Sequence, residues 1–219
     1  MGNIAIDGPA GAGKSTIAKM VAKELGFIYV DTGAMYRAMA LFMIKSGIST
    51  DKTEEISATC KDADITIKYE NGEQVVYLNG ENVNGQIRTE EVGNMASVSS
   101  ANPDVRKKLV ELQQKLAKTT DVVMDGRDIG TVVLPDAALK VYLTASSKVR
   151  AERRFKELTA KGVECDIDVI EKDIIDRDYR DMHREFSPLK QADDAILVDS
   201  SDMTIDEVAK KIIELYKTV

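Results

Sequence analysis

The stretch NIAIDGPAGAGKSTIAKMVAKEL, residues 3–25, decides the fold of this 219-residue chain. Residues 3–7 form a short apolar run typical of a buried strand, and residues 16–25 carry apolar side chains at helical spacing. Between them, residues 8–15 satisfy the pattern GxxxxGK[ST], which binds phosphate when a strand precedes it and a helix follows it. The sequence therefore predicts a phosphate-binding loop (P-loop) in which nucleotide contacts come from Gly8, Pro9, Ala10, Gly11, Ala12, Gly13, Lys14, Ser15 and Thr16.

Two side chains of this loop are expected to carry chemistry. Lys14 should reach the β- and γ-phosphates, and Ser15 should ligate Mg²⁺, which neutralises the charge shared between those phosphates. The glycines let backbone amides approach phosphate oxygens closely, and the following helix directs its positive end to the same place. The alternative is a glycine-rich turn that holds no ligand.

The rest of the chain repeats the strand and helix alternation. Further short apolar runs occur at residues 27–30, 122–125, 139–144 and 195–198, and helical patterns such as residues 34–45 lie between or after them. Five such strands predict an α/β fold, with a five-stranded parallel sheet that is covered by helices on both faces.

Two segments depart from this alternation. Residues 63–83 read as alternating strands separated by Asn71-Gly72 and Asn79-Gly80, pairs that favour tight hairpin turns, so they predict a small antiparallel sheet followed by helices over 89–100 and 103–118. Later, helical patterns over 151–161 and 169–184 flank a loop at 162–168 and predict a helical arm.

Composition excludes several classes of protein. Thirty Lys and Arg against 37 Asp and Glu give a net charge of −7, so binding to nucleic acid through diffuse positive charge is not expected. Only Cys60 and Cys165 occur, outside any CxxC pattern, which supports neither a disulfide framework nor a thiolate metal site. No apolar run approaches the roughly 20 residues needed to cross a bilayer. A cytoplasmic enzyme with small-molecule substrates and no membrane partner is the expectation.

The P-loop leaves open whether the chain is a GTPase, an ATPase motor or a small-molecule kinase. No NKxD-like guanine motif is present, and Arg177, Arg180 and Arg184 fall at i, i+3 and i+7, which places them on one helix face. One interpretation is a solvated face paired with neighbouring aspartates. The other is phosphoryl transfer, in which several donors gather around the charge on the transferring oxygens.

Four segments in order resemble the bacterial cytidylate kinase family of P-loop nucleoside monophosphate kinases. They are IDGPAGAGKST at 6–16, DTGAMYR at 31–37, DGRDIGTVVLPDA at 125–137 and RDYRDMHREFSPL at 177–189. The P-loop is shared with many families, whereas DGRDIGTVV and the RDxRDxxR arrangement are much more specific. The inserted small sheet at 63–83 also resembles one that distinguishes these enzymes from shorter monophosphate kinases, so the resemblance extends over essentially the whole chain.

This resemblance implies transfer of a phosphoryl group from ATP to CMP, with dCMP also accepted and Mg²⁺ as the metal. It implies a single P-loop kinase chain, monomeric, with a core at 1–62, 119–150 and 185–219, a monophosphate-binding insertion at 63–118 and a helical lid at 151–184. The expected catalytic residues are Lys14 of the P-loop and Arg154 and Arg177, which closure of the lid would bring to the phosphates. The implied acceptor-binding residues are Thr32, Tyr36, Arg37, Ser97, Arg106, Arg127, Asp128, Arg177, Asp181 and Arg184.

The chemistry of cytosine matches this set. Asp128 can accept from the N4 amino group, while Arg106 and Ser97 can donate toward N3 or O2; uracil would turn its O4 acceptor toward Asp128 and be rejected. The alternative for Asp128 is a residue that caps the loop at 126–130. Asp125 ends a strand near the P-loop, where it could hold a Mg²⁺-bound water or serve only the strand end.

Two other functions stay open at this point. One is a P-loop kinase for another acceptor, such as UMP, AMP or a small metabolite. The other is a nucleotide-gated binding module, which would need the P-loop but not the second set of arginines.

Overall fold

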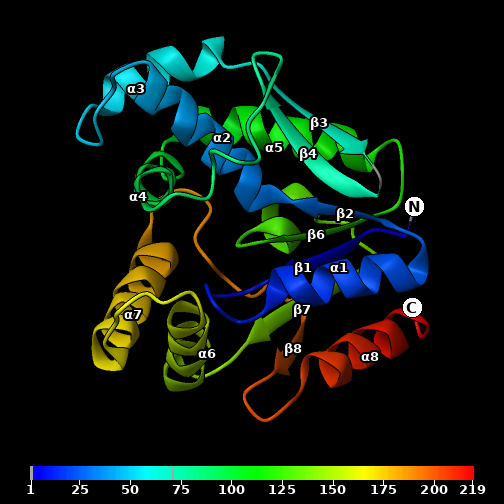
Figure 1. Cartoon of the computed structure of the whole chain (residues 1–219). Coiled ribbons are helices and arrows are strands. Elements are labelled where there is room, and N and C mark those ends of the chain that lie inside the picture. Colours follow the sequence, from blue (N-terminus) through cyan, green and yellow to red (C-terminus); the bar gives the residue numbers. More distant parts are fainter. Residues whose placement is uncertain (1, 71) are drawn as a thin grey trace. The chain divides into compact units, whose positions relative to one another are not determined.

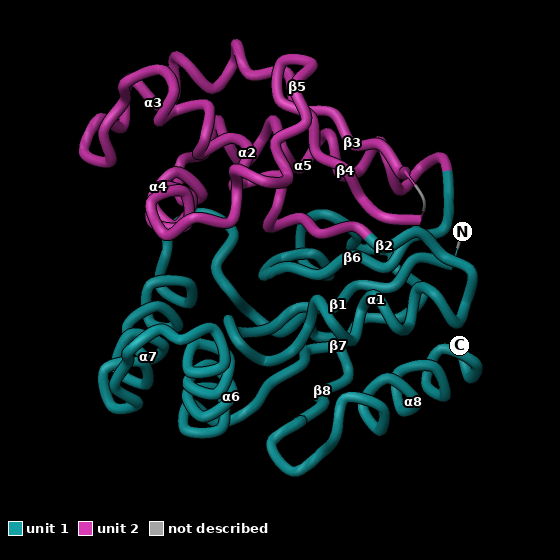
Figure 2. The backbone as a smooth tube through the Cα atoms, in the orientation of Figure 1, with its two compact units in different colours: residues 1–29, 120–219 teal, residues 30–119 magenta. Residues whose placement is uncertain are grey.

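The computed structural model describes residues 2–70 and 72–219, and the chain divides into two compact units (Figures 1 and 2). Unit 1 consists of Met1–Tyr29 and Thr120–Val219, and unit 2 is the internal segment Val30–Thr119. The division into core, insertion and lid that the sequence resemblance implies stays a prediction, because compactness alone does not identify which segments bind substrate or move.

The predicted five-stranded sheet is present. Its strand order is β2-β6-β1-β7-β8, and β1 pairs in parallel with both β6 and β7, while β7 pairs in parallel with β8. All four residues of β1 are buried, as expected for a central strand of a parallel sheet. The strands are β1 (Ile4–Asp7), β2 (Ile28–Asp31), β6 (Val122–Gly126), β7 (Leu139–Thr144) and β8 (Ile196–Asp199).

Two helices of unit 1 pack together and share the core of the sheet. These are α1 (Lys14–Leu25) and α8 (Ile205–Tyr216), which lie side by side in Figure 1. Ile17 and Val21 of α1 and Ile212 of α8 are buried with apolar side chains of β1, β6, β7 and β8. This packing holds the end of β1 and the start of α1 in place, and therefore fixes the position of the P-loop that connects them.

Unit 1 also contains the predicted helical arm. Helices α6 (Ser147–Ala160) and α7 (Ile167–His183) pack against each other, and Asp166 caps α7 by accepting from the amides of Asp168 and Val169. No residue of α7 is fully buried. Among the described residues, no helix of either unit is long and apolar enough to span a membrane.

The segment after β6 differs from the expected loop at 126–130. Residues Ile129–Val133 form one π-helical turn, in which the Leu134 amide donates to the Ile129 carbonyl at 2.7 Å and the Val133 amide donates to that of Asp128 at 3.3 Å. A single π turn leaves no repeating pattern of apolar residues, so hydrophobic periodicity cannot reveal it. The turn follows Asp128 directly.

Unit 2 contains the predicted antiparallel sheet, with the strand order β3-β4-β5. Gly72, Asn79 and Gly80 have positive φ angles, as tight turns require; Asn71 of the first predicted turn lies outside the described residues. The helix α3 was not predicted, because its sequence TEEISAT buries only Ile56. The elements of unit 2 after β2 are α2 (Thr32–Lys45), α3 (Thr53–Thr59), the 3₁₀ turn Cys60–Asp62, β3 (Ile65–Glu70), β4 (Glu73–Leu78), β5 (Glu81–Asn82), α4 (Glu90–Ser99) and α5 (Pro103–Ala117).

Candidate active site

The P-loop has the backbone geometry that its glycines permit. Gly8 has a φ of 148°, and a Cβ built on it would lie 1.9 Å from the Leu143 carbonyl oxygen, so a side chain cannot fit there. Gly13 has a φ of 88° and forms the left-handed N-cap of α1. The first turn of α1 contains no acidic residue, which leaves its positive end available to an anion.

Lys14 is buried inside this loop. Its Nζ donates to the Pro9 carbonyl at 2.8 Å. Burial, followed by the nearby Arg127 guanidinium, lowers the pKa of Lys14 to about 7, although three carboxylates oppose the shift. Phosphate groups bound in the loop would favour the charged ammonium, so the position suits a donor nucleotide.

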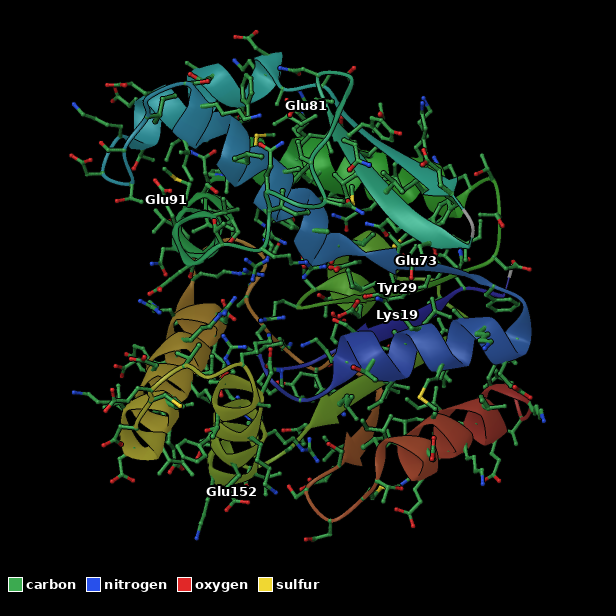
Figure 3. The ribbon with its side chains drawn as sticks, viewed as in Figure 1. Lys19, Tyr29, Glu73, Glu81, Glu91 and Glu152 are labelled. Carbon is green, nitrogen blue, oxygen red and sulfur yellow. The ribbon has the colours of Figure 1, made fainter. Side chains whose placement is uncertain are left out.

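Asp125, at the end of β6, joins two hydroxyl groups. Ser15 Oγ donates to its Oδ2 at 2.9 Å, and the Tyr29 hydroxyl donates to its Oδ1 at 2.8 Å. Lys19 lies beside Tyr29, with its ammonium nitrogen 5.5 Å from the ring centroid (Figure 3). A hydroxyl and a carboxylate are the hard oxygen ligands that Mg²⁺ prefers, so Ser15 and Asp125 fit the metal that this loop is expected to use.

The DGRD segment and helix α7 bring together four of the predicted acceptor residues. Arg127 Nε donates to Asp181 Oδ2 at 2.9 Å, and a terminal nitrogen of Arg184 lies 4.0 Å from Asp128 Oδ1. Burial by itself would raise the pKa of Asp181, but Arg127, with Arg177 and Arg184, more than offsets it and holds that pKa below its usual range. The cluster is therefore rich in arginine, and its arginines keep the Asp181 carboxylate ionised.

The arginines of α7 differ in exposure. Arg184, just beyond the last helical residue, has a side chain only 9% exposed, and Arg177 is half-buried, whereas Arg180 is exposed. A purely solvated face would leave all three in water. The interpretation as a solvated face is therefore wrong for Arg184 and holds only for Arg180.

Asp128 is 4% exposed and occupies the N-cap position of the π turn. Its side chain makes no capping hydrogen bond to the turn; the backbone carbonyl of Asp128 accepts from Val132 instead. This geometry does not favour the capping alternative. The buried carboxylate lies beside Arg184.

Sequence reasoning assigned no role to Arg150, although the structure places it at the P-loop. Its guanidinium donates to the carbonyls of Ala145 at 2.9 Å and Ala10 at 3.0 Å, and to Asp178 Oδ2 of α7 at 2.6 Å. Arg150 therefore links the P-loop to α7. The only feature of the sequence that points to a role for Arg150 is its place close to Arg153 and Arg154.

Arg154, predicted to be catalytic, lies elsewhere on α6. Its guanidinium donates to Glu157 at 2.8 Å, and its side chain is 50% exposed. An exposed pair of this kind adds little stability, so it opposes movement of Arg154 only weakly. The catalytic role of Arg154 stays a prediction.

Unit 2 contains five further predicted acceptor residues, while the tenth, Arg177, lies on α7 of unit 1. Thr32 is the first residue of α2 and is buried. The preceding residue, Asp31, is the N-cap of this helix, and its carboxylate accepts from the Ala34 amide at 2.9 Å. Further along α2, the Tyr36 ring lies under the Arg106 guanidinium of α5 at 5.4 Å, and Arg106 also donates to the Ser100 carbonyl at 3.1 Å.

Two more predicted acceptor residues belong to the same unit. The Arg37 side chain of α2 lies against Gly93 of α4. A Cβ atom added to Gly93 would lie 3.1 Å from the Arg37 guanidinium. Ser97 is half-buried on α4. Within unit 2, the structure therefore brings Tyr36 close to Arg106, and carries Arg37 and Ser97 on the packed helices α2 and α4.

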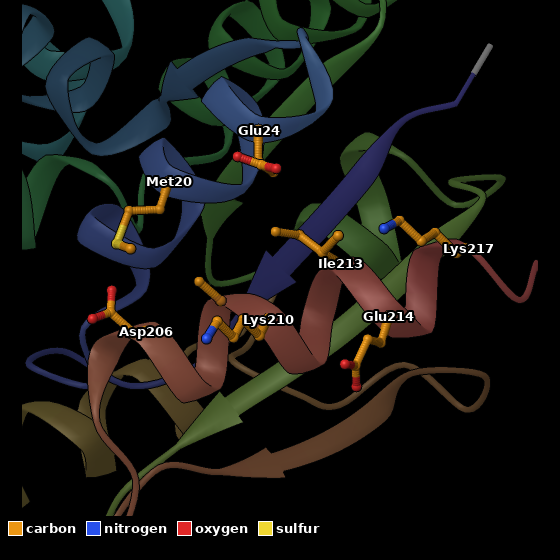
Figure 4. A pocket seen from close by; sticks show the side chains of 8 residues that line it. Met20, Glu24, Asp206, Lys210, Ile213, Glu214 and Lys217 are labelled. Carbon is orange, nitrogen blue, oxygen red and sulfur yellow. The ribbon is translucent and has the colours of Figure 1, made fainter.

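A groove between α1 and α8 lies apart from the predicted site residues of both units (Figure 4). It is lined by Met20, Glu24, Asp206, Ala209, Lys210, Ile213, Glu214 and Lys217. None of the predicted site residues lines it, and its mixed charges indicate no ligand class, so the groove carries no functional assignment.

Comparison with known proteins supports a family assignment. The family model described as cytidylate kinase matches residues 4–218. The cytidylate kinase of Caldicellulosiruptor saccharolyticus is 52% identical over 217 residues, covering 99% of this chain and 96% of its own. That of Ligilactobacillus salivarius is 50% identical over 214 residues, covering 98% of this chain and 96% of its own.

The fold of this chain is also similar to that of a solved structure. Shikimate kinase from Bacteroides thetaiotaomicron is 13% identical with a TM-score of 0.50, and the match covers 98% of each chain, so it supports the architecture alone. The sequence relatives are much closer and match nearly their whole length. This chain belongs to the cytidylate kinase family.

Proposed function

We propose that this chain transfers the γ-phosphoryl group of ATP to CMP, giving ADP and CDP, and that it also accepts dCMP. The observation that carries the proposal is the combination, within unit 1, of a complete P-loop with a buried Asp128 carboxylate beside arginines. A nucleotide-gated binding module would need the first feature but not the second. Family membership supports the same reaction.

The donor side follows from the P-loop. Residues 8–16 hold the ATP phosphates, and Lys14 exchanges its bond to the Pro9 carbonyl for the β- and γ-phosphates. Ser15 and Asp125 would hold Mg²⁺, which would neutralise charge on the donor phosphates. These residues align the donor and stabilise its charge.

The acceptor side follows from the arginine cluster. Arg127, Arg177 and Arg184 are suited to the phosphate of CMP, since guanidinium groups pair with phosphate oxygens in a fixed geometry. No general base is required, because the acceptor phosphate is already an anionic nucleophile. His183, the single histidine, is exposed, and its Nδ1 lies 2.8 Å from the Tyr179 carbonyl oxygen.

The base is recognised by Asp128 in this proposal. Its carboxylate accepts from the N4 amino group of cytosine and repels O4 of uracil. Ser97 and Arg106 of unit 2 are proposed to donate to the same base, on the strength of the family resemblance. The helical arm α6 and α7 is proposed to act as a lid that excludes water from ATP.

A first prediction concerns phosphate binding. Arg184→Ala is expected to lower kcat/KM for CMP and dCMP alike by about ten- to a hundredfold, because a charged hydrogen bond to the shared phosphate is lost. Arg180→Ala is the matched control, since Arg180 lies in the last turns of α7, one turn before Arg184, but is exposed. Steady-state kinetics with both acceptors measure the effect, and equal behaviour of the two variants would remove Arg184 from phosphate binding.

A second prediction concerns the sugar. If Asp181 accepts from the ribose 2′-hydroxyl, Asp181→Ala should lower the CMP to dCMP ratio of kcat/KM by about tenfold, because only CMP offers that donor. Losing the partner of Arg127 affects the phosphate of both acceptors equally and cancels in the ratio. Asp176→Ala, an exposed change on the same helix, should leave the ratio unchanged. Equal losses for both acceptors in Asp181→Ala would contradict a role in sugar recognition.

A further inference from the structure

Asp7 connects the P-loop to the Asp128 segment. It is the last residue of β1, directly before Gly8, and it is 5% exposed. Its Oδ1 accepts from the Ile129 amide at 2.8 Å and its Oδ2 accepts from the Gly130 amide at 2.7 Å. These are the first two amides after Asp128, so one carboxylate holds the start of the π turn with both oxygens.

The surroundings of Asp7 are unfavourable for an ionised carboxylate. Burial raises its pKa to about 6, even though the bonds from Gly130 and Ile129 oppose the shift. A carboxyl group with a raised pKa contributes stability below its ordinary value, and that contribution is lost as the pH rises through about 6. At neutral pH the fold therefore keeps a carboxylate that lowers its stability, which is common at functional sites.

We propose that Asp7 is a positioning residue for recognition of the acceptor base. It fixes the backbone at Ile129 and Gly130, and through this backbone it sets where the Asp128 carboxylate lies relative to the P-loop. The inference rests on the proposed role of Asp128 in reading cytosine.

A competing role for Asp7 is to balance the charge of Lys14. Lys14 does lower the pKa of Asp7, but it is the last of the five influences on that carboxyl group, and Lys14 Nζ donates to the Pro9 carbonyl. A charge-balancing role predicts a defect in ATP use. A positioning role predicts a defect in the choice of acceptor.

The test is the variant Asp7→Asn in the full-length protein. Asparagine keeps the shape, but its amide group donates, so it faces one of the two backbone donors and breaks that hydrogen bond. The CMP to UMP ratio of kcat/KM is expected to fall about tenfold, while the KM for ATP stays within about twofold. Asp199→Asn is the matched control, because Asp199 also ends a strand of this sheet and accepts from a backbone amide, that of Ser201, at 2.9 Å. Its ratio should not change.

A double-mutant cycle with Asp128→Asn separates the two roles. If Asp7 acts through Asp128, the double variant should lose little more of the ratio than Asp128→Asn, whereas independent effects would multiply. Should Asp7→Asn fail to fold, as judged by its melting curve, Asp7→Ser serves instead, since a serine hydroxyl can still accept from one amide. The same fall in the ratio is expected.

The outcomes are distinguishable. An unchanged ratio in Asp7→Asn or Asp7→Ser, alongside a lowered ratio in Asp128→Asn, overturns the positioning role and leaves base recognition by Asp128 intact. A raised KM for ATP with an unchanged ratio overturns it in favour of charge balance. An unchanged ratio in Asp128→Asn removes the proposed base recognition, and the role of Asp7 falls with it.

Discussion

Replacement of Lys14 by alanine is expected to lower kcat by about 10²- to 10³-fold, because the variant loses a preorganised charge aimed at the transferring phosphate. The Nζ atom is buried in the P-loop and donates to Pro9. It therefore lies among the residues proposed to hold the donor. Binding of CMP should remain close to that of the unmodified enzyme, since acceptor contacts are proposed to come from other residues.

Steady-state kinetics and CMP titration of Lys14→Ala together check this expectation. Lys23→Ala is the matched control, because Lys23 lies on the same helix but is exposed, and its kcat should not change. A near-normal kcat in a folded Lys14→Ala protein would contradict the proposed role of the P-loop in the reaction.

The second large effect is expected in Asp128→Asn. Asparagine keeps the shape of aspartate but adds an amide donor that can turn toward uracil O4, so CMP should be used less well and UMP better. The loss of one base contact is worth about ten- to a hundredfold in the CMP to UMP ratio of kcat/KM. The preference for CMP over UMP should therefore decrease, because kcat/KM falls for CMP and rises for UMP.

The capping alternative makes a different prediction for the same variant. Asparagine caps a helical turn about as well as aspartate, so under this alternative Asp128→Asn would leave the CMP to UMP ratio unchanged, whereas Asp128→Ala would lower the melting temperature and reduce activity toward both acceptors together. The structure gives the Asp128 side chain no capping bond. Kinetics with both acceptors and a melting curve distinguish the two, and an unchanged CMP to UMP ratio contradicts base recognition.

Local patterns predicted much of the fold. The pattern of residues 8–15 in its strand and helix context located the P-loop, and the apolar runs located all five strands of the parallel sheet within one or two residues. These features are readable because each depends on neighbours in sequence. The same holds for the hairpin turn at Asn79-Gly80, where both residues have positive φ angles.

The features that the sequence did not reveal depend on partners far apart in the chain. The hydrogen bond from the Ile129 amide to the Asp7 carboxylate joins residues 122 positions apart, and that from the Arg150 guanidinium to the Ala10 carbonyl joins residues 140 positions apart. No spacing rule connects such pairs in a single sequence. Helix α3 was missed for another reason, since a short polar helix with one buried residue has no periodicity to detect.

The most direct measurement is ADP release by the unmodified protein with ATP, Mg²⁺ and each nucleoside monophosphate in turn. We expect rapid ADP formation with CMP and dCMP, much slower formation with UMP and AMP, and almost none without an acceptor. Equal turnover of UMP or AMP would contradict a cytosine-specific site. Absence of ADP formation with every monophosphate would contradict the kinase itself and favour a nucleotide-gated binding module.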